Sequence, residues 1–352
     1  MSNSKQSISE AEKEQLLQLM KRRQLKDQIL PLLKEIKEKH KEEAESLSLG
    51  GSPNYEALVD AVAACWGRGL LSTEVLTGKL DQAELAGKQH VILFKVPEEK
   101  VELTRQRLAA KTSLLARRGV KEFLKVPTST TAYLLADTAE EIVVKLVGRR
   151  LDWVEHVREK RDDWEVIERR RVIERTSIII KFASVHNVLQ IRVPPRGGFG
   201  VSETSRKVYL VALAVLDSAY GKEGTALLQD VSAFPLDAAY AKLVKNRTDF
   251  IMLSDSPENP HFRAMFAGRG ARGVQDIRDL KDYSFDKSTF ARTMMRGGWK
   301  TDEEVYAYTT MHWEKVKTSS NAQRDIARIY FPHMNTDAEV ERVIGRICDH
   351  AF

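Results

Sequence analysis

Cysteine is scarce in this chain: the sequence holds only Cys65 and Cys348. Two cysteines so far apart cannot build the disulfide framework of a small secreted protein, and such low usage is typical of a reducing compartment. The opening residues are polar and charged, without the apolar stretch of a signal peptide. We therefore expect a cytoplasmic protein, or a nuclear one if the source is eukaryotic.

Long apolar runs are also missing. The longest one spans nine residues, from Val208 to Leu216, whereas a membrane-spanning helix needs roughly 20. This run therefore predicts a buried helix, at about residues 202–220, and we expect no membrane association.

Motifs of the common enzyme classes do not occur. The sequence has no G-x-x-x-x-G-K-[ST] phosphate loop, no C-x-x-C, no G-x-S-x-G and no H-E-x-x-H. Asp162, Asp163 and Glu165 could suggest a nuclease metal site, but mixed-charge stretches usually pair internally. We expect His186 and His312 to be turn and packing residues, and we expect no metal and no cofactor. These absences favour a non-enzymatic protein, although a catalytic site assembled from scattered residues stays an open alternative.

One glycine pattern, Gly268-Arg-Gly-Ala-Arg-Gly273, matches the dinucleotide fingerprint G-x-G-x-x-G. That fingerprint binds a pyrophosphate when it joins a strand to a helix inside a βαβ unit. Here a proline-containing loop at 254–260 separates it from the last clear strand. The pattern therefore favours an Arg/Gly loop over a nucleotide site.

Charge is abundant and nearly balanced. The chain carries 56 Lys and Arg against 50 Asp and Glu, for a net charge of +6 and a pI near 9.1. The densest charge lies in a ribbon at 149–175, where nine basic and eight acidic residues fill 17 of 27 positions. Such a segment cannot be core, so we expect a self-paired, solvent-facing extension of a sheet. The modest excess of positive charge makes an acidic partner plausible.

The first half predicts two units. Residues 1–50 read as a charged helical arm, with a capping box at Ser9 and Glu12 and an apolar stripe interrupted by Pro31. Residues 51–130 read as a helical subdomain with one strand at 91–96 and a basic helix at 98–125. The order helix–turn–helix–strand fits a winged-helix unit, and it fits other small α+β subdomains equally well.

The second half predicts a sheet followed by helices. Residues 131–222 read as an antiparallel sheet with a packed helix, including a hairpin whose turn is 183–187. Alternation of apolar and polar residues at Val188, Gln190 and Arg192 favours one solvated face. Residues 223–352 read as mainly helical apart from a strand at 250–253, with capping boxes at Thr301/Glu304 and Thr336/Glu339. The fold class is therefore α+β.

Two basic segments suggest a function. Seven basic residues stand against two acidic ones from 101 to 125, and nine against four from 262 to 300, where aromatic residues are interleaved. Arginines contact phosphates and aromatic rings stack on bases, so we expect a non-enzymatic nucleic-acid-binding protein that uses DNA or RNA backbone contacts. The same aromatics could equally be core anchors with a solvated arginine rim. The expected contacts are Arg105, Arg107, Lys111, Arg117, Arg118, Arg196, Arg263, Arg269, Arg272, Arg292, Arg296 and Lys300.

The alternative is a protein–protein adaptor or assembly subunit. In that interpretation the helical arm, residues 9–47, and the charged ribbon are the docking surfaces, and charge complementarity selects the partner.

Overall fold

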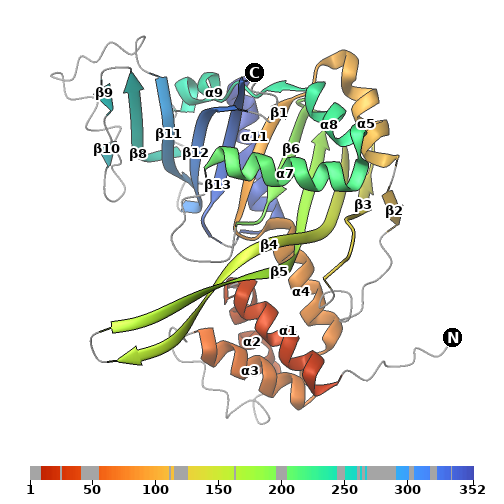
Figure 1. The fold of residues 1–352 in the computed structure, drawn as a ribbon, viewed down its shortest axis with the longest axis vertical. Coiled ribbons are helices and arrows are strands. Elements are labelled where there is room, and N and C mark those ends of the chain that lie inside the picture. The colour runs from red at the N-terminus through yellow and green to blue at the C-terminus, as the bar shows by residue number, and fades with distance from the viewer. Residues whose placement is uncertain are drawn as a thin grey trace.

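The protein is α+β, with helices on both faces of one large, mostly antiparallel sheet (Figure 1). The computed structural model describes residues 9–23, 26–40, 55–110, 112–114, 126–161, 164–195, 204–243, 250–259, 262–263, 266–267, 291–300, 305–317, 323–333 and 335–352. In this part of the chain no helix is long and apolar enough to cross a membrane.

The sheet contains thirteen strands among the described residues. Its order is β10-β8-β11-β12-β13-β1-β6-β5-β4-β3-β2. Outside this order, β7 pairs with β1 and β9 pairs with β8. Among the described residues, all strand pairs are antiparallel except β2 with β3. The strands are β1 (Gln89–Lys95), β2 (Thr112–Leu114), β3 (Thr131–Asp137), β4 (Glu141–Arg161), β5 (Trp164–Ala183), β6 (Val188–Val193), β7 (Ser232–Ala233), β8 (Phe250–Asn259), β9 (Phe262–Arg263), β10 (Phe266–Ala267), β11 (Ala291–Lys300), β12 (Val305–Lys317) and β13 (Gln323–Phe331).

One face of the sheet is covered by α5 (Val101–Ala109), α7 (Ser205–Tyr220) and α8 (Lys222–Gln229). Strand residues alternate between faces, so Val144 of β4 and Ile180 of β5 share an apolar cluster with Val208 and Leu216 of α7. The expected buried helix is α7, capped by the hydroxyl of Thr204. In Figure 1 it crosses the front of the sheet and leaves β8 and β11 beyond its first turn.

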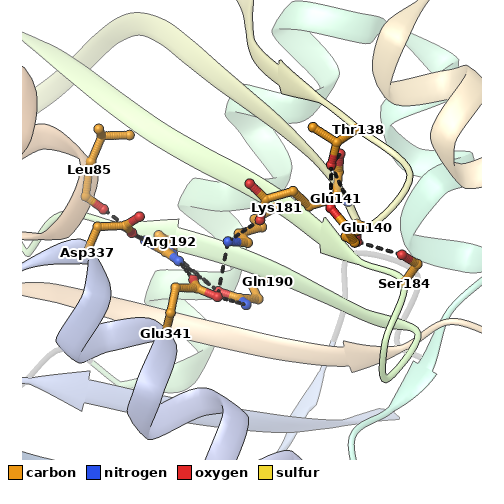
Figure 2. A network of polar contacts seen from close by, with 10 residues as sticks. All are labelled: Leu85, Thr138, Glu140, Glu141, Lys181, Ser184, Gln190, Arg192, Asp337 and Glu341. Carbon is orange, nitrogen blue, oxygen red and sulfur yellow. Dashed lines mark hydrogen bonds and ion pairs between the residues drawn. The ribbon is translucent and has the colours of Figure 1, made fainter.

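The opposite face packs against α4 (Thr73–Ala86), α9 (Leu236–Leu243) and α11 (Asp337–Ala351). Here the expected solvated face is wrong: Gln190 and Arg192 are 1% and 2% exposed. The Arg192 guanidinium donates to Asp337, at 2.6 Å, and to Glu341 of α11, while Lys181 lies 3.1 Å from the Glu341 carboxylate (Figure 2). The polar residues of this face are buried because α11 supplies carboxylates that compensate their charge.

The N-terminal arm is a packed unit. Helices α1 (Glu10–Arg23) and α2 (Lys26–Lys39) lie against α3 (Tyr55–Gly67). Leu16 and Leu33 are fully buried in one cluster with residues of α3 and α4. The capping box of α1 forms as expected, since the Ser9 backbone N–H donates to Glu12 at 2.9 Å. The apolar stripe of the arm is therefore used inside the protein.

The charged ribbon is a two-stranded hairpin. Strands β4 and β5 pair from Glu141 with Ala183 to Arg161 with Trp164, with one register shift between Val157 and Glu159. Their outer part projects well beyond the sheet (Figure 1). The second expected hairpin also forms, with the turn at 184–187 between β5 and β6.

Two helical expectations are wrong. The expected strand at 250–253 forms as the first part of β8, but the rest of region 223–352, expected to be mainly helical, contributes β11, β12 and β13. The box at Thr301/Glu304, itself outside the described residues, precedes strand β12 instead of a helix. The basic helix ends at Ala109, since Thr112–Leu114 pairs with β3 as strand β2. In each case pairing within the large sheet overrides the local helical signal.

Candidate nucleic-acid interface

Part of the α7 side of the sheet carries polar and aromatic residues. The register joins four residues into one row across β11, β12, β13 and β1: Arg296, Thr310, Tyr330 and His90. A neighbouring row contains His312 of β12 and Arg328 of β13, and Tyr308 lies on the other side of Thr310. We call these seven residues the open face, because Arg296 is exposed and Tyr308 keeps 36% of its surface.

The floor of the open face is a buried polar cluster. Arg328, 3% exposed, donates from Nε to the Ser205 hydroxyl at 2.8 Å, which ties the start of α7 to the sheet. Its NH1 group lies 3.0 Å from Nδ1 of His90. Because a guanidinium can only donate, His90 accepts through Nδ1 and carries its proton on Nε2. His90 is therefore neutral.

His312 is also held neutral. Burial and the nearby charge of Arg328 together lower the pKa of His312 to about 3. The Glu314 carboxylate lies 3.9 Å from His312 Nδ1, beyond hydrogen-bond distance, and does not offset this effect. The positive charge of the open face therefore comes from its arginines.

Aromatic rings stand at two positions of this surface. Tyr330 stacks on His90 with ring centroids 4.5 Å apart and planes at 27°. Tyr308 meets His333 edge-on at 5.7 Å. Rings of this kind offer stacking surfaces for planar groups.

Additional positive charge lies where α7 begins. Arg206 and Lys207 are both exposed in its first turn, which contains no acidic residue. Cations at a helix N-terminus are unfavourable, because the helix dipole is positive there. Two of them beside an arginine-bearing sheet make this end of α7 strongly attractive to anions.

Of the twelve expected contacts, Arg296 lies on the open face. Lys300 ends the same strand after a bulge and is half-buried. Arg263 and Arg292 lie on β9 and β11, with their side chains outside the described part. The structure does not describe Lys111, Arg117, Arg118, Arg196, Arg269 and Arg272, nor any residue of the glycine pattern at 268–273.

The two arginines of α5 lie elsewhere and are engaged in ion pairs. Arg105 donates to Asp137 at 2.6 Å, and Arg107 pairs with Asp230 and with Glu223, the latter at 3.1 Å. The hydrogen bond from Arg107 lowers the pKa of the Asp230 carboxyl. Helix α5 packs on β4, six strands away from β11 on the same side of the sheet. Among the described residues, the arginines of α5 and Arg296 therefore do not share one surface.

Sequence reasoning missed the aromatic and buried members of the open face. Their signal is an alternation in β12, where Tyr308, Thr310 and His312 on one side alternate with buried Ala307, Thr309 and Met311. This pattern becomes informative once the segment is known to be a strand. No protein-family model matches the sequence, and no curated protein matches it significantly.

Proposed function

We propose that the protein is a non-enzymatic nucleic-acid-binding protein and that the open face is its contact surface. The observation that carries the proposal is the row of Arg296, Thr310, Tyr330 and His90, in which charge for phosphate and rings for bases occur side by side. Arg206 and Lys207 extend the positive charge to the start of α7. Phosphate contacts position a nucleic acid, and neighbouring rings provide contacts with bases.

Charge reversal tests this proposal. Arg296→Glu and Arg206→Glu should each weaken binding of a labelled oligonucleotide, measured by fluorescence anisotropy. Each should also reduce the slope of log affinity against log salt by about 1, because a phosphate contact and its released counterion are lost. Lys222→Glu is the matched control: Lys222 is exposed at the start of α8, just beyond the far end of α7, which lies about 21 Å along that helix from Arg206.

The outcomes are distinct. Weaker binding in both variants with an unchanged control supports the open face. If single strands and duplexes of DNA and RNA all fail to bind the wild-type protein at low salt, the proposal is wrong.

One observation favours a second candidate, the docking of a protein partner by the charged ribbon. Leu151 and Ile173 lie opposite each other on β4 and β5 and are 51% and 56% exposed. Exposed Arg149 and Arg171 lie near this apolar pair. An acidic protein surface with an apolar centre would complement them.

Deletion of the helical arm is not a suitable test of this candidate. Deleting residues 1–50 would expose the core side chains of α3, so loss of a partner would be uninformative. A photo-crosslinking amino acid at position 151 avoids that damage and should give a discrete protein adduct in cells. The same label at exposed Leu210 of α7 is the control. Equal adducts at both positions, or none at 151, would count against the ribbon.

A further inference from the structure

Thr310 is a small residue between two larger ones. It pairs with Arg296 on one side and with Tyr330 on the other, so its side chain stands between a guanidinium group and an aromatic ring. Thr310 is half-buried and Arg296 is exposed. The surface of the row is therefore lowest at Thr310, between the longer side chains of Arg296 and Tyr330.

The ring on one side of Thr310 is held in place. Tyr330 stacks on His90, which is 3% exposed and lies 3.0 Å from the Arg328 guanidinium. Since His90 covers the β1 side of the ring, the opposite side of the ring is directed towards Thr310. A fixed ring loses little conformational entropy when a ligand stacks on it.

The spacing of the strands matches one planar group. Neighbouring strands lie about 4.8 Å apart, so β11 and β13 are separated by roughly 10 Å. A flat ring in contact with a neighbour on each side needs about 3.5 Å per contact, or roughly 7 Å in all. The remaining distance leaves room for the long, flexible arginine to adjust its plane.

We propose that the open face binds single-stranded nucleic acid by inserting one unpaired base over Thr310, between Tyr330 and the guanidinium of Arg296. A base in a duplex is stacked and paired, so it cannot enter this slot without being extruded. Phosphates flanking the base would lie near Arg206 and Lys207, and a neighbouring base would lie over Tyr308. This inference rests on the proposed nucleic-acid-binding function and names its substrate class.

Three probes separate base insertion from backbone binding: an oligothymidine strand of about 15 nucleotides, an abasic strand of the same length, and a duplex of the same length. Stacking of bases on aromatic and arginine side chains should make the oligothymidine bind about 10- to 100-fold more tightly than the abasic strand. Equal affinity for oligothymidine and the abasic strand, or tighter binding of the duplex, overturns the inference and leaves the proposed function standing. Failure of all three probes at low salt overturns the inference, and failure of RNA single strands and duplexes as well overturns the proposed function.

Substitutions of Thr310 and Arg296 test where the base binds. Thr310→Phe fills the slot with a ring and should remove the preference for oligothymidine over the abasic strand, whereas Thr310→Val keeps the shape and should retain the preference. Arg296→Lys keeps the charge but removes the planar group, so it should lower the ratio of oligothymidine affinity to abasic affinity several-fold. Because Arg296 is exposed, this variant stays informative even if Thr310→Phe fails to fold. Wild-type preference in Arg296→Lys, or in a folded Thr310→Phe, overturns the inference.

Discussion

Removing His312 should flatten the dependence of stability on pH. In the folded protein, burial lowers the pKa of His312 to about 3, whereas the ordinary value is 6.5. Because the pKa of His312 is lower in the folded protein, lowering the pH below 6.5 protonates His312 in the unfolded chain but not in the folded protein. The stabilisation is therefore complete above about pH 6.5 and is lost progressively as the pH falls towards 3.

The size of this loss of stability follows from the folded and unfolded pKa values of His312. At about pH 5 the solution is roughly 1.5 pH units below the unfolded pKa, and each unit is worth about 1.4 kcal/mol. Wild type should therefore lose about 2 kcal/mol of unfolding free energy between about pH 7.5 and pH 5 through this group. The side chain is only 18% exposed, so solvent screening reduces this figure little.

Urea unfolding at several pH values measures the effect. His312→Gln should remove about 2 kcal/mol of the pH dependence, whatever constant loss of stability the substitution causes. Carboxylates titrate alike in both proteins and cancel in the comparison. His40→Gln, at the exposed end of α2, is the control and should keep the wild-type slope. An equal slope in His312→Gln and wild type would refute the reasoning.

Three further predictions concern packing and charge. Arg206→Glu places an acid in the first turn of α7 and should raise stability by about 0.3–1 kcal/mol while weakening nucleic-acid binding; unchanged binding with raised stability would remove Arg206 from the interface. Gly297→Ala would overlap the ring of Phe250 and should cost about 1–3 kcal/mol in thermal unfolding, since the strand must shift; a neutral effect would contradict the close contact. Glu341→Ala removes one carboxylate from the buried Arg192 and should lower the free energy of unfolding in urea by about 2 kcal/mol. A loss below a few tenths of a kcal/mol would mean that Asp337 alone compensates the charge of Arg192.

Local signals predicted the elements that depend on neighbouring residues. The capping boxes at Ser9 and Thr336 form as expected. The apolar run at 208–216 lies inside α7. These features need only interactions within a few residues of the chain, which the sequence displays directly.

Whether the polar residues of the sheet are exposed or buried could not be predicted in the same way. Alternation of apolar and polar residues at Gln190 and Arg192 suggested solvent, yet α11 covers both with carboxylates from 145 and 149 residues away in the chain. A sequence window does not contain such distant partners, so it cannot distinguish a solvated face from a compensated one. The expected site at Arg105 and Arg107 depended on the same limitation, because both pair with acids distant in sequence.

By itself, the sequence determined the charge balance, the α+β class, the helix caps at Ser9 and Thr336 and the projecting ribbon. Only the tertiary structure decided that β1, β11, β12 and β13 lie side by side, and therefore that Arg296, Thr310, Tyr330 and His90 form one row. The physical reason is that strand pairing is non-local: hydrogen bonds between strands join residues more than two hundred positions apart, and no local propensity specifies which strands become neighbours.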